Sequence, residues 1–399
     1  MTQERIYKDR NLQIICGVVL IAVMGVSSLS PALPEIREAL NISRPQTGVL
    51  IAAFTLPSVI LVPFIGVLAD RIGRKRLMVP SLFIFALAGG ACALVRDFNL
   101  LVVLRVIQGI GVVPLGPAAG AIIGDIFTGK RRNQAMGLYA GMWDVAAALC
   151  GLAGGALAGL SWNYPFLLPL IAIPVGIVVQ FNLKNPEPEK GQGLREYLGG
   201  VWGHLKSLRV LSIFIAGFML FFIFYGTYIT YFGHFLADSF GASPALIGII
   251  IASRGLTTGL VASQLGRLSR LISLANIAKL GFILSAAALV LIRFTPGLGI
   301  MPVSSIVFGI GFGMSMASLM TLAVGLAHSR YRGAFIAFYT EMLRIGQTVG
   351  PLLIGLAYVY AGFDGVFLYA AGAYLLTGLI GLIGGKIMPS RQPLAGVDS

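Results

Sequence analysis

Long apolar runs alternate with short polar segments along the whole chain. A helix needs about 20 apolar residues to cross the hydrocarbon core of a bilayer. Backbone groups inside lipid must find their partners within the protein, so runs of this length predict spanning helices. The predicted spans have approximate cores at 12–30, 46–69, 77–95, 99–123, 135–160, 164–182, 210–235, 244–266, 272–292, 299–326, 333–360 and 364–386. The pattern therefore predicts an all-α polytopic membrane protein with twelve transmembrane helices.

The composition excludes most classes of soluble protein. The 399 residues are 57% hydrophobic and 11% charged, whereas a soluble domain is about 25% charged. A soluble globule of this composition would expose large apolar patches to water. A disordered chain would have more charge and fewer apolar residues. We therefore expect the lipid bilayer to be the chain's surroundings.

The basic residues predict how the spans are oriented. Cytoplasmic loops collect Lys and Arg, and here these residues concentrate before the first span and after the even-numbered spans. The loops after the odd-numbered spans hold only Arg37, Arg44, Arg96 and Arg293. Both termini are therefore expected in the cytoplasm. The formal net charge of +14 then indicates topology and contact with anionic lipid, not a nucleic-acid partner.

The chain divides into two halves of six spans. Its longest non-membrane stretch follows the sixth span, and residues 194–208 within it have the pattern of a short amphipathic surface helix. We predict an N-terminal bundle over 1–182, a cytoplasmic linker over 183–209 and a C-terminal bundle over 210–399. Some residues recur at an offset of 199 or 200: Arg131, Ala135 and Gly151 match Arg330, Ala334 and Gly350, and Gly48, Ala52 and Gly66 match Gly248, Ala252 and Gly266. Parallel repeats with a substrate site between them are known among secondary transporters.

A charged loop follows the second span. It reads Gly66-Val67-Leu68-Ala69-Asp70-Arg71-Ile72-Gly73-Arg74-Lys75-Arg76, which resembles the signature loop G-x-x-x-D-R-x-G-R-[RK] of the major facilitator superfamily at every defined position. Its glycines permit a tight reversal, and its charges can hold the two bundles together in one state and release them in the next. The resemblance implies a cytoplasmic gate made of Gly66, Asp70, Arg71, Gly73, Arg74 and, at the end of the fourth span, Asp125. The alternative is that the basic residues only follow the positive-inside rule.

Two further segments resemble the drug:proton antiporter branch of that superfamily. The fourth span reads R-x-x-Q-G-x-G from Arg105 to Gly111, as in that branch, and Ser27–Ile36, which contains Pro31-Ala32-Leu33-Pro34-Glu35-Ile36, is similar to the end of its first helix. The fifth span keeps the glycines of the branch's G-P-x-x-G-G motif but lacks the proline, whereas the eleventh span contains a Gly-Pro pair. The resulting helix-packing motif, in which small residues permit close approach, comprises Gly151, Gly154, Gly155, Gly350 and Pro351.

Five charged residues lie well inside the predicted spans: Arg105, Asp144, Arg254, Glu341 and Arg344. An ionisable residue at this depth is a functional hypothesis by default. The resemblance places the fifth and eighth helices face to face, so we predict that Asp144 pairs with Arg254 in one conformation and that protonation weakens the pair. We assign proton coupling to Asp144, Glu341 and Arg105.

Three alternatives remain open for these charges. Asp144 could instead be a structural partner of Arg105. Glu341 and Arg344, at positions i and i+3, could form a static pair that aids helix packing. The unpaired positive charge of Arg254 or Arg344 could be met by backbone carbonyls and water, or it could await an anionic group of the substrate.

Aromatic residues accompany the intramembrane charges. The seventh span carries an aromatic stripe, and Tyr139 and Trp143 stand one turn apart beside Asp144. Such faces suit apolar or cationic ligands, and they suit lipid contact and helix packing equally well. The predicted substrate cavity comprises Arg254, Arg344, Tyr139, Trp143, Phe221, Tyr225, Tyr228 and Tyr339.

Other functional classes lack a sequence signal. His204, His234 and His328 have no ligand-spaced partner, and the three cysteines show no paired spacing, so we expect neither a metal site nor a disulfide framework. No Walker loop indicates ATP-driven pumping, no constellation of side chains indicates a membrane-embedded enzyme, and no signalling domain indicates a receptor. We expect no cofactor.

The resemblance implies a secondary-active transporter in a prokaryotic cytoplasmic membrane. It favours a proton-coupled exporter of small amphipathic or drug-like molecules that works by alternating access. The alternative is an exporter or facilitator of one metabolite, such as a sugar, siderophore or lipid. The expected partners are a small-molecule substrate, protons and lipid, and we expect a monomer.

Overall fold

The computed structural model of the chain describes residues 6–183, 207–326 and 332–385, and these residues are helical apart from short connections. The N-terminal half contains α1 (Arg10–Ser27), α2 (Leu33–Leu40), α3 (Arg44–Ile72), α4 (Arg74–Cys92), α5 (Phe98–Val112), α6 (Leu115–Ile126), α7 (Gly129–Ala158), η3 (Tyr164–Ile171) and α8 (Ala172–Asn182). The C-terminal half contains α10 (Leu208–Ile223), η4 (Phe224–Ile229), α11 (Thr230–Phe240), α12 (Pro244–Ser263), α13 (Leu265–Leu271), α14 (Leu274–Phe294), α15 (Met301–Leu326), α16 (Arg332–Asp364), η7 (Gly365–Tyr369) and α17 (Ala370–Gly385).

The predicted all-α membrane fold is confirmed. Eleven helical stretches of the described residues are long and apolar enough to cross a membrane. The last of them, Phe335–Leu379, contains the final two predicted spans. These spans separate at Ala361 and Gly362, whose backbone angles are not helical. Gly362 has a φ of 56°, which a residue with a Cβ rarely adopts, so this glycine permits the chain to reverse there.

Several spans contain breaks that hydrophobicity does not predict. The fourth span is divided into α5 and α6 just before Leu115, where Pro114 can donate no backbone hydrogen bond. The sixth span begins as a 3₁₀ segment, η3, which contains Pro169. The seventh span contains a π-helical turn, η4, between α10 and α11. π-turns inside α-helices are frequent at functional sites, and this one lies within the aromatic stripe.

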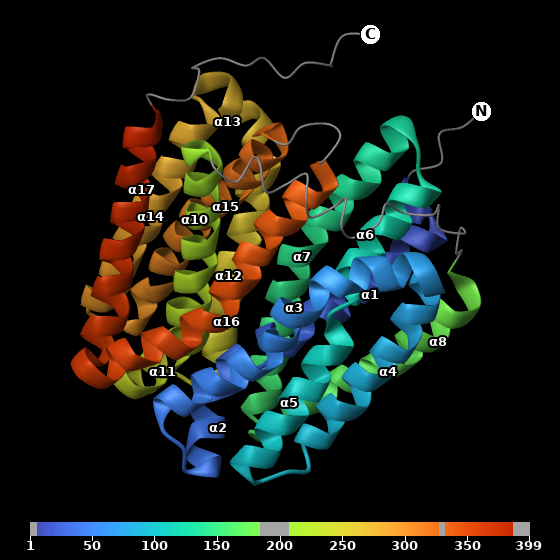
Figure 1. The fold of residues 1–399 in the computed structure, drawn as a ribbon. Helices are drawn as coiled ribbons and strands as arrows, with labels where there is room; N and C mark the ends of the chain where they lie inside the picture. Colours follow the sequence, from blue (N-terminus) through green and yellow to red (C-terminus); the bar gives the residue numbers. More distant parts are fainter. Residues whose placement is uncertain (1–5, 184–206, 327–331, 386–399) are drawn as a thin grey trace.

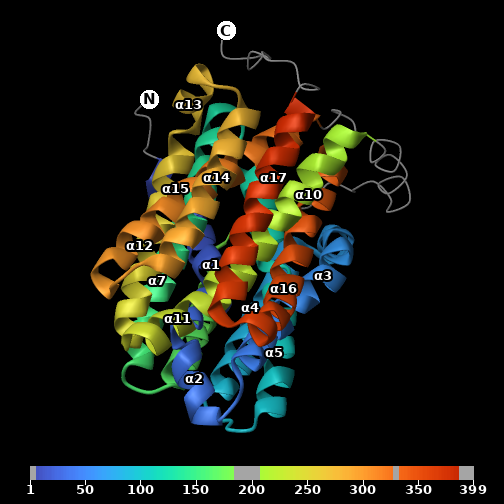
Figure 2. The same cartoon turned by 90° about the vertical axis from the view of Figure 1, so that its left-hand side faces the viewer.

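The two halves form neighbouring bundles (Figure 1). Helices α7 and α3 of the first half pack against α12 and α16 of the second. We call the end at which α1 begins and α17 ends the terminal end, and the opposite end, where α2 lies against α11, the far end. Figure 2 shows the outer side of the second half, where α10 lies between α16 and α17. Two helix pairs, α7 with α12 and α3 with α16, therefore line the boundary between the halves. We call each of these contacts a seam.

The predicted linker falls largely outside the described residues. Only residues 183 and 207–209 of the stretch 183–209 are described. The amphipathic helix at 194–208 and the domain boundaries therefore stay predictions.

Candidate functional site

One face of α7 runs along α12. The two helices are in close contact near the far end and separate toward the terminal end. Near the far end, a Cβ added to Gly248 of α12 would lie 2.7 Å from the Gly151 carbonyl oxygen. Further along, a Cβ at Gly259 would lie 3.5 Å from the Asp144 Cβ, which is ordinary contact. On the next turns of the same α7 face, a Cβ at Gly141 or at Gly137 would have no atom within 4 Å. Asp144 therefore lies where the seam between the halves begins to open toward the terminal end.

The second seam, between α3 and α16, has the same design. A Cβ at Gly48 would lie 2.9 Å from the Pro351 carbonyl oxygen, and the Thr348 hydroxyl donates to the Thr55 hydroxyl at 2.9 Å. The next turn of this α16 face carries Arg344. Each seam therefore carries a charged side chain beyond its close backbone contact, Asp144 on α7 and Arg344 on α16.

The two intramembrane acids are unpaired in this conformation. Asp144 is within electrostatic range of Arg254, but no ion pair joins these two described residues. Both carboxylate oxygens of Glu341 are buried without a hydrogen-bond partner. The i, i+3 spacing of Glu341 and Arg344 allows a pair, but no ion pair joins these two described residues. Glu341 is an electrostatic neighbour of Arg344, together with Tyr225 on η4 and Tyr139 on α7.

Arg254 is enclosed by aromatic rings of the second half. Arg254 is only 4% exposed. Its guanidinium carbon lies 4.6 Å from the ring centre of Phe224 and 5.5 Å from that of Phe312. The guanidinium nitrogens Nε and Nη1 are buried without a hydrogen-bond partner. The cation is therefore stabilised by ring faces while two of its donor atoms stay unsatisfied.

These residues form a connected set at the boundary between the halves. Tyr225 is within electrostatic range of both Arg254 and Arg344, and it is partly exposed. The set, which we call the polar ring, comprises Tyr139, Asp144, Tyr225, Arg254, Glu341 and Arg344. Its members come from α7, η4, α12 and α16, so relative movement of the halves changes the distances within it.

The predicted aromatic cavity residues divide into two groups. Tyr139 and Trp143 are partly exposed on α7, and the Tyr139 hydroxyl donates to the Gly116 carbonyl at 2.9 Å. Phe221 is partly exposed and stacks on Tyr225, with ring centres 5.7 Å apart. Tyr228 and Tyr339, in contrast, are fully buried. They pack inside the second half, against Phe308 and Phe214 respectively.

Arg105 lies in the core of the first half, apart from the polar ring. It is 1% exposed, and it donates to the carbonyls of Gly25 (2.7 Å) and Leu50 (3.3 Å) and to the Gln108 amide oxygen (2.7 Å). Its guanidinium also lies 4.3 Å from the ring centre of Phe54. Backbone carbonyls and an amide therefore serve this arginine, and Asp144 is not its partner.

The glycines of the packing motif lie at close helix contacts. A Cβ at Gly154 would meet the backbone of Ser28, one at Gly155 would meet Pro244 across the seam, and one at Gly350 would meet Phe222. Gly151 and Pro351 supply the carbonyls that approach Gly248 and Gly48. Small residues at these positions allow the backbones to approach.

The signature loop is only partly as predicted. Gly73 has a φ of 93° and joins α3 to α4, so it supports the expected reversal. Gly66 instead lies inside α3, and a Cβ there would meet no atom within 4 Å, so in this conformation it neither turns the chain nor permits a close contact. Arg74 forms an ion pair with Asp125, Arg71 is exposed, and the side chain of Asp70 is outside the described part of the structure.

The described ranges contain no candidate metal site. Across residues 6–183, 207–326 and 332–385, no three His, Cys, Asp or Glu side chains gather closely enough to hold an ion.

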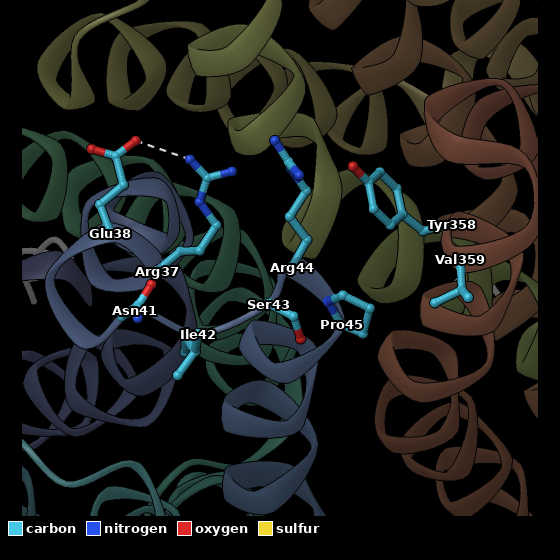
Figure 3. A pocket seen from close by; sticks show the side chains of 9 residues that line it. All are labelled: Arg37, Glu38, Asn41, Ile42, Ser43, Arg44, Pro45, Tyr358 and Val359. Atoms are coloured by element: carbon cyan, nitrogen blue, oxygen red, sulfur yellow. Dashed lines mark hydrogen bonds and ion pairs between the residues drawn. The ribbon is translucent and has the colours of Figure 1, made fainter.

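A second polar cluster, which the sequence analysis did not identify, joins the halves at the far end. Asp238 of α11 accepts from Arg37 of α2 and from Arg44 of α3, with ion-pair distances of 3.3 and 2.7 Å. Figure 3 shows both arginine side chains at a pocket, with Tyr358 next to Arg44. The volume of this pocket is about 540 Å³. We call the set that bridges the halves the far-end cluster; it comprises Ser30, which donates to the Ile229 carbonyl, Thr47, which bonds His234, and Arg37, Arg44 and Asp238. The sequence did offer one indication of this cluster. Arg37 and Arg44 are two of the few basic residues in the loops after the odd-numbered spans.

Replacing Asp238 with asparagine is expected to loosen the far end. An ion pair of about 1 kcal/mol shifts an equilibrium about fivefold, and this one carboxylate holds two arginines of the other half. We expect a cysteine placed at the buried Ser30, in a chain whose native cysteines are replaced by alanine, to react about fivefold faster with an impermeant maleimide. Glu38→Gln is the matched control, because the exposed Glu38 pairs with Arg37 inside one half. Equal labelling rates in Asp238→Asn and the parent chain would contradict a closing role for the cluster.

Comparison with known proteins agrees with this architecture. The chain matches the Major Facilitator Superfamily over residues 15–238 and 226–396. It is 25% identical to the "Bacillibactin exporter" of Bacillus subtilis (strain 168), over 86% of this chain and 88% of that protein. It is 24% identical to "Multidrug resistance protein 1" of the same strain, over 88% of this chain and 90% of that protein.

A solved structure shares the fold. A mutant of the nucleoside transporter NupG superimposes with a TM-score of 0.81 at 15% sequence identity, covering 94% of this chain and 99% of that one. The fold, with two six-helix bundles that meet at paired seams, agrees with the sequence match over nearly the whole length. The chain belongs to the Major Facilitator Superfamily.

Proposed function

We propose that the chain is a proton-coupled exporter of small amphipathic molecules. Both termini lie in the cytoplasm in this proposal, so the seams open toward the cytoplasm and the far-end cluster closes the outer side. Substrate enters between the halves from the terminal end, and the bundles rock to release it at the far end. The loop at Gly66, Asp70, Arg71, Gly73 and Arg74, with Asp125, acts as the cytoplasmic gate when that end closes.

The observation that carries proton coupling is the state of Glu341. Both of its carboxylate oxygens are buried without a hydrogen-bond partner. An ionised carboxylate in such a place is costly, whereas a protonated one is tolerated. Glu341 lies on α16, about two turns from Thr348, whose hydroxyl donates to Thr55 of α3 across the seam. Rocking therefore changes the surroundings of Glu341 and its proton occupancy.

Asp144 supplies the second step of this proposal. Closure of the terminal end brings α7 toward α12 beyond Gly259, and thus brings Asp144 closer to Arg254. Ionised Asp144 then forms the predicted pair, and a proton from the outer side releases it. Arg105 supports both steps indirectly, since it holds α5 to the Gly25 and Leu50 carbonyls of α1 and α3.

The names of the relatives support small amphipathic substrates. One is called a bacillibactin exporter and the other a multidrug resistance protein. The second candidate function, export of one specific metabolite such as a siderophore, is favoured by the first of these names. Gradient-driven transport of several unrelated dyes would favour a multidrug range, and transport of one compound class alone would favour the second candidate.

Neutralising either acid is expected to uncouple transport from the proton gradient. In vesicles with an imposed pH gradient, we expect Asp144→Asn and Glu341→Gln to reduce accumulation of the dye Hoechst 33342 to the level seen without a gradient. Dye movement down its own concentration gradient should persist, because the substrate path is retained. Asp364→Asn is the control, since Asp364 is an exposed carboxylate paired with Arg293. Wild-type accumulation in both acid variants would overturn the proposed coupling.

A further inference from the structure

Two cations of the polar ring act on the same aromatic segment. The guanidinium carbon of Arg254 on α12 lies 4.6 Å from the ring centre of Phe224, and that ring lies 5.2 Å from the ring of Tyr225. Both aromatic residues belong to the π-turn η4, which interrupts the seventh span between α10 and α11 and packs against α16. Tyr225 is also an electrostatic neighbour of both Arg254 and Arg344 of α16.

The acids of the ring do not neutralise these cations. No ion pair joins Arg254 to Asp144 or Arg344 to Glu341 in the described structure, although each acid lies within electrostatic range. Nε and Nη1 of Arg254 have no hydrogen-bond partner at all. Arg105 is the internal comparison, because the same residue type in the first half is fully served by two carbonyls and an amide. The unsatisfied donors of Arg254 are therefore a local feature of the ring and not a general property of buried arginines in this chain.

We propose that the anionic group of an amphipathic substrate binds between Arg254 and Arg344 beside Tyr225. This proposal rests on the proposed export function and specifies its substrate class as an organic anion: a carboxylate, phenolate or phosphate attached to an apolar or aromatic body. Guanidinium groups bind such oxygens through paired, charge-assisted hydrogen bonds. Phe221, which stacks on Tyr225, gives the apolar body an aromatic surface next to the anion site.

Asp144 acts in this scheme as the competitor of the substrate. In the open conformation Arg254 is unpaired and accepts the substrate anion. When the terminal end closes, ionised Asp144 approaches Arg254 and displaces the anion toward the far end. A proton from outside then neutralises Asp144 and breaks the Asp144–Arg254 pair, and the proton leaves to the cytoplasm after the terminal end reopens. One anion moves outward and one proton inward in each cycle.

A matched pair of ligands tests the anion site on the purified full-length chain. 2-Naphthoate and 2-naphthamide share one ring system and differ in the charge of one group. We expect calorimetric titration at neutral pH to give about tenfold tighter binding of naphthoate, the effect of one charge-assisted contact. Arg254→Gln and Arg344→Gln should each remove this preference while naphthamide binding persists, and Arg254→Lys should retain part of it. Arg293→Gln, which changes a partly exposed arginine at the far end, should leave the preference unchanged.

Two results would overturn the proposal: equal affinity of the wild-type chain for both ligands, or an undiminished naphthoate preference in both arginine variants. The comparison of the two ligands on the wild-type chain needs no variant, so it tests the proposal even if a variant fails to fold. Gradient-driven transport of Hoechst 33342 and of 2-naphthoate, measured in parallel, separates this inference from the proposed function. Dye export without an anion preference refutes only the anion site, whereas absence of gradient-driven transport of both compounds refutes the export function itself.

Discussion

Gly248→Val is expected to abolish gradient-driven transport by forcing the far end apart. A Cβ at this position would lie 2.7 Å from the Gly151 carbonyl oxygen, and valine adds two methyl groups beyond it. The carbonyl belongs to the α7 backbone, so no side-chain rotation relieves the overlap, and the helices must separate. Overpacking of this kind costs about 1–3 kcal/mol, which reduces the population of the far-end-closed conformation about fivefold to more than a hundredfold.

Spin labels measure the expected shift directly. We would attach them at the exposed positions Met136 of α7 and Leu260 of α12, near the terminal end of the seam, and measure their separation by double electron–electron resonance. Rocking predicts that the terminal end closes as the far end opens, so the distance should shorten in Gly248→Val. Gly372→Val is the matched control, because a Cβ at Gly372 meets no atom within 4 Å. Wild-type transport and an unchanged distance in Gly248→Val would show that this close approach plays no part in the cycle.

Arg105→Ala is expected to destabilise the first half severely. The substitution removes three hydrogen bonds and leaves the Gly25 and Leu50 carbonyls and the Gln108 amide oxygen without this donor. Hydrogen bonds to a charged group contribute about 1.5–3 kcal/mol each, so the loss of three amounts to about 4.5 kcal/mol or more. Thermal unfolding of the purified protein in detergent should show a clearly lowered Tm, with little folded protein recovered from membranes.

The conservative variant distinguishes a scaffold from a proton carrier. Arg105→Lys keeps the charge but loses the planar fork that reaches several acceptors at once, so its Tm should lie between wild type and Arg105→Ala. Arg293→Ala, which removes only a partly exposed ion pair with Asp364, should leave the Tm nearly unchanged, because surface pairs contribute about 0–1 kcal/mol. A normal Tm in Arg105→Ala combined with loss of proton coupling would contradict the scaffold role and place Arg105 in the proton path.

Much of the membrane topology was predictable, whereas the pairing of charges was not. Apolar runs near 20 residues fix the spans because lipid leaves the backbone no other partner. The spacing of Glu341 and Arg344 allowed a static pair on one helix face, yet no ion pair joins these described residues, and Arg344 also has electrostatic neighbours on α7 and η4. Spacing along one helix cannot account for groups that approach from other helices. The far-end cluster escaped prediction for the same reason, since Asp238 follows Arg44 by nearly half the chain.

The sequence by itself determined the twelve spans, the repeat and the superfamily resemblance. These properties depend on local composition and on residues close together along the chain. Only the tertiary structure decided that Arg105 is satisfied by carbonyls and an amide, that Asp144 lies where a seam opens, and that Arg254 is enclosed by aromatic rings with two unsatisfied donors. The structure also explains the sequence matches at an offset of 200. Gly48 and Gly248 lie at equivalent close contacts of the two seams. Charges buried in lipid depend on contacts between helices, and those contacts exist only after the bundles have packed.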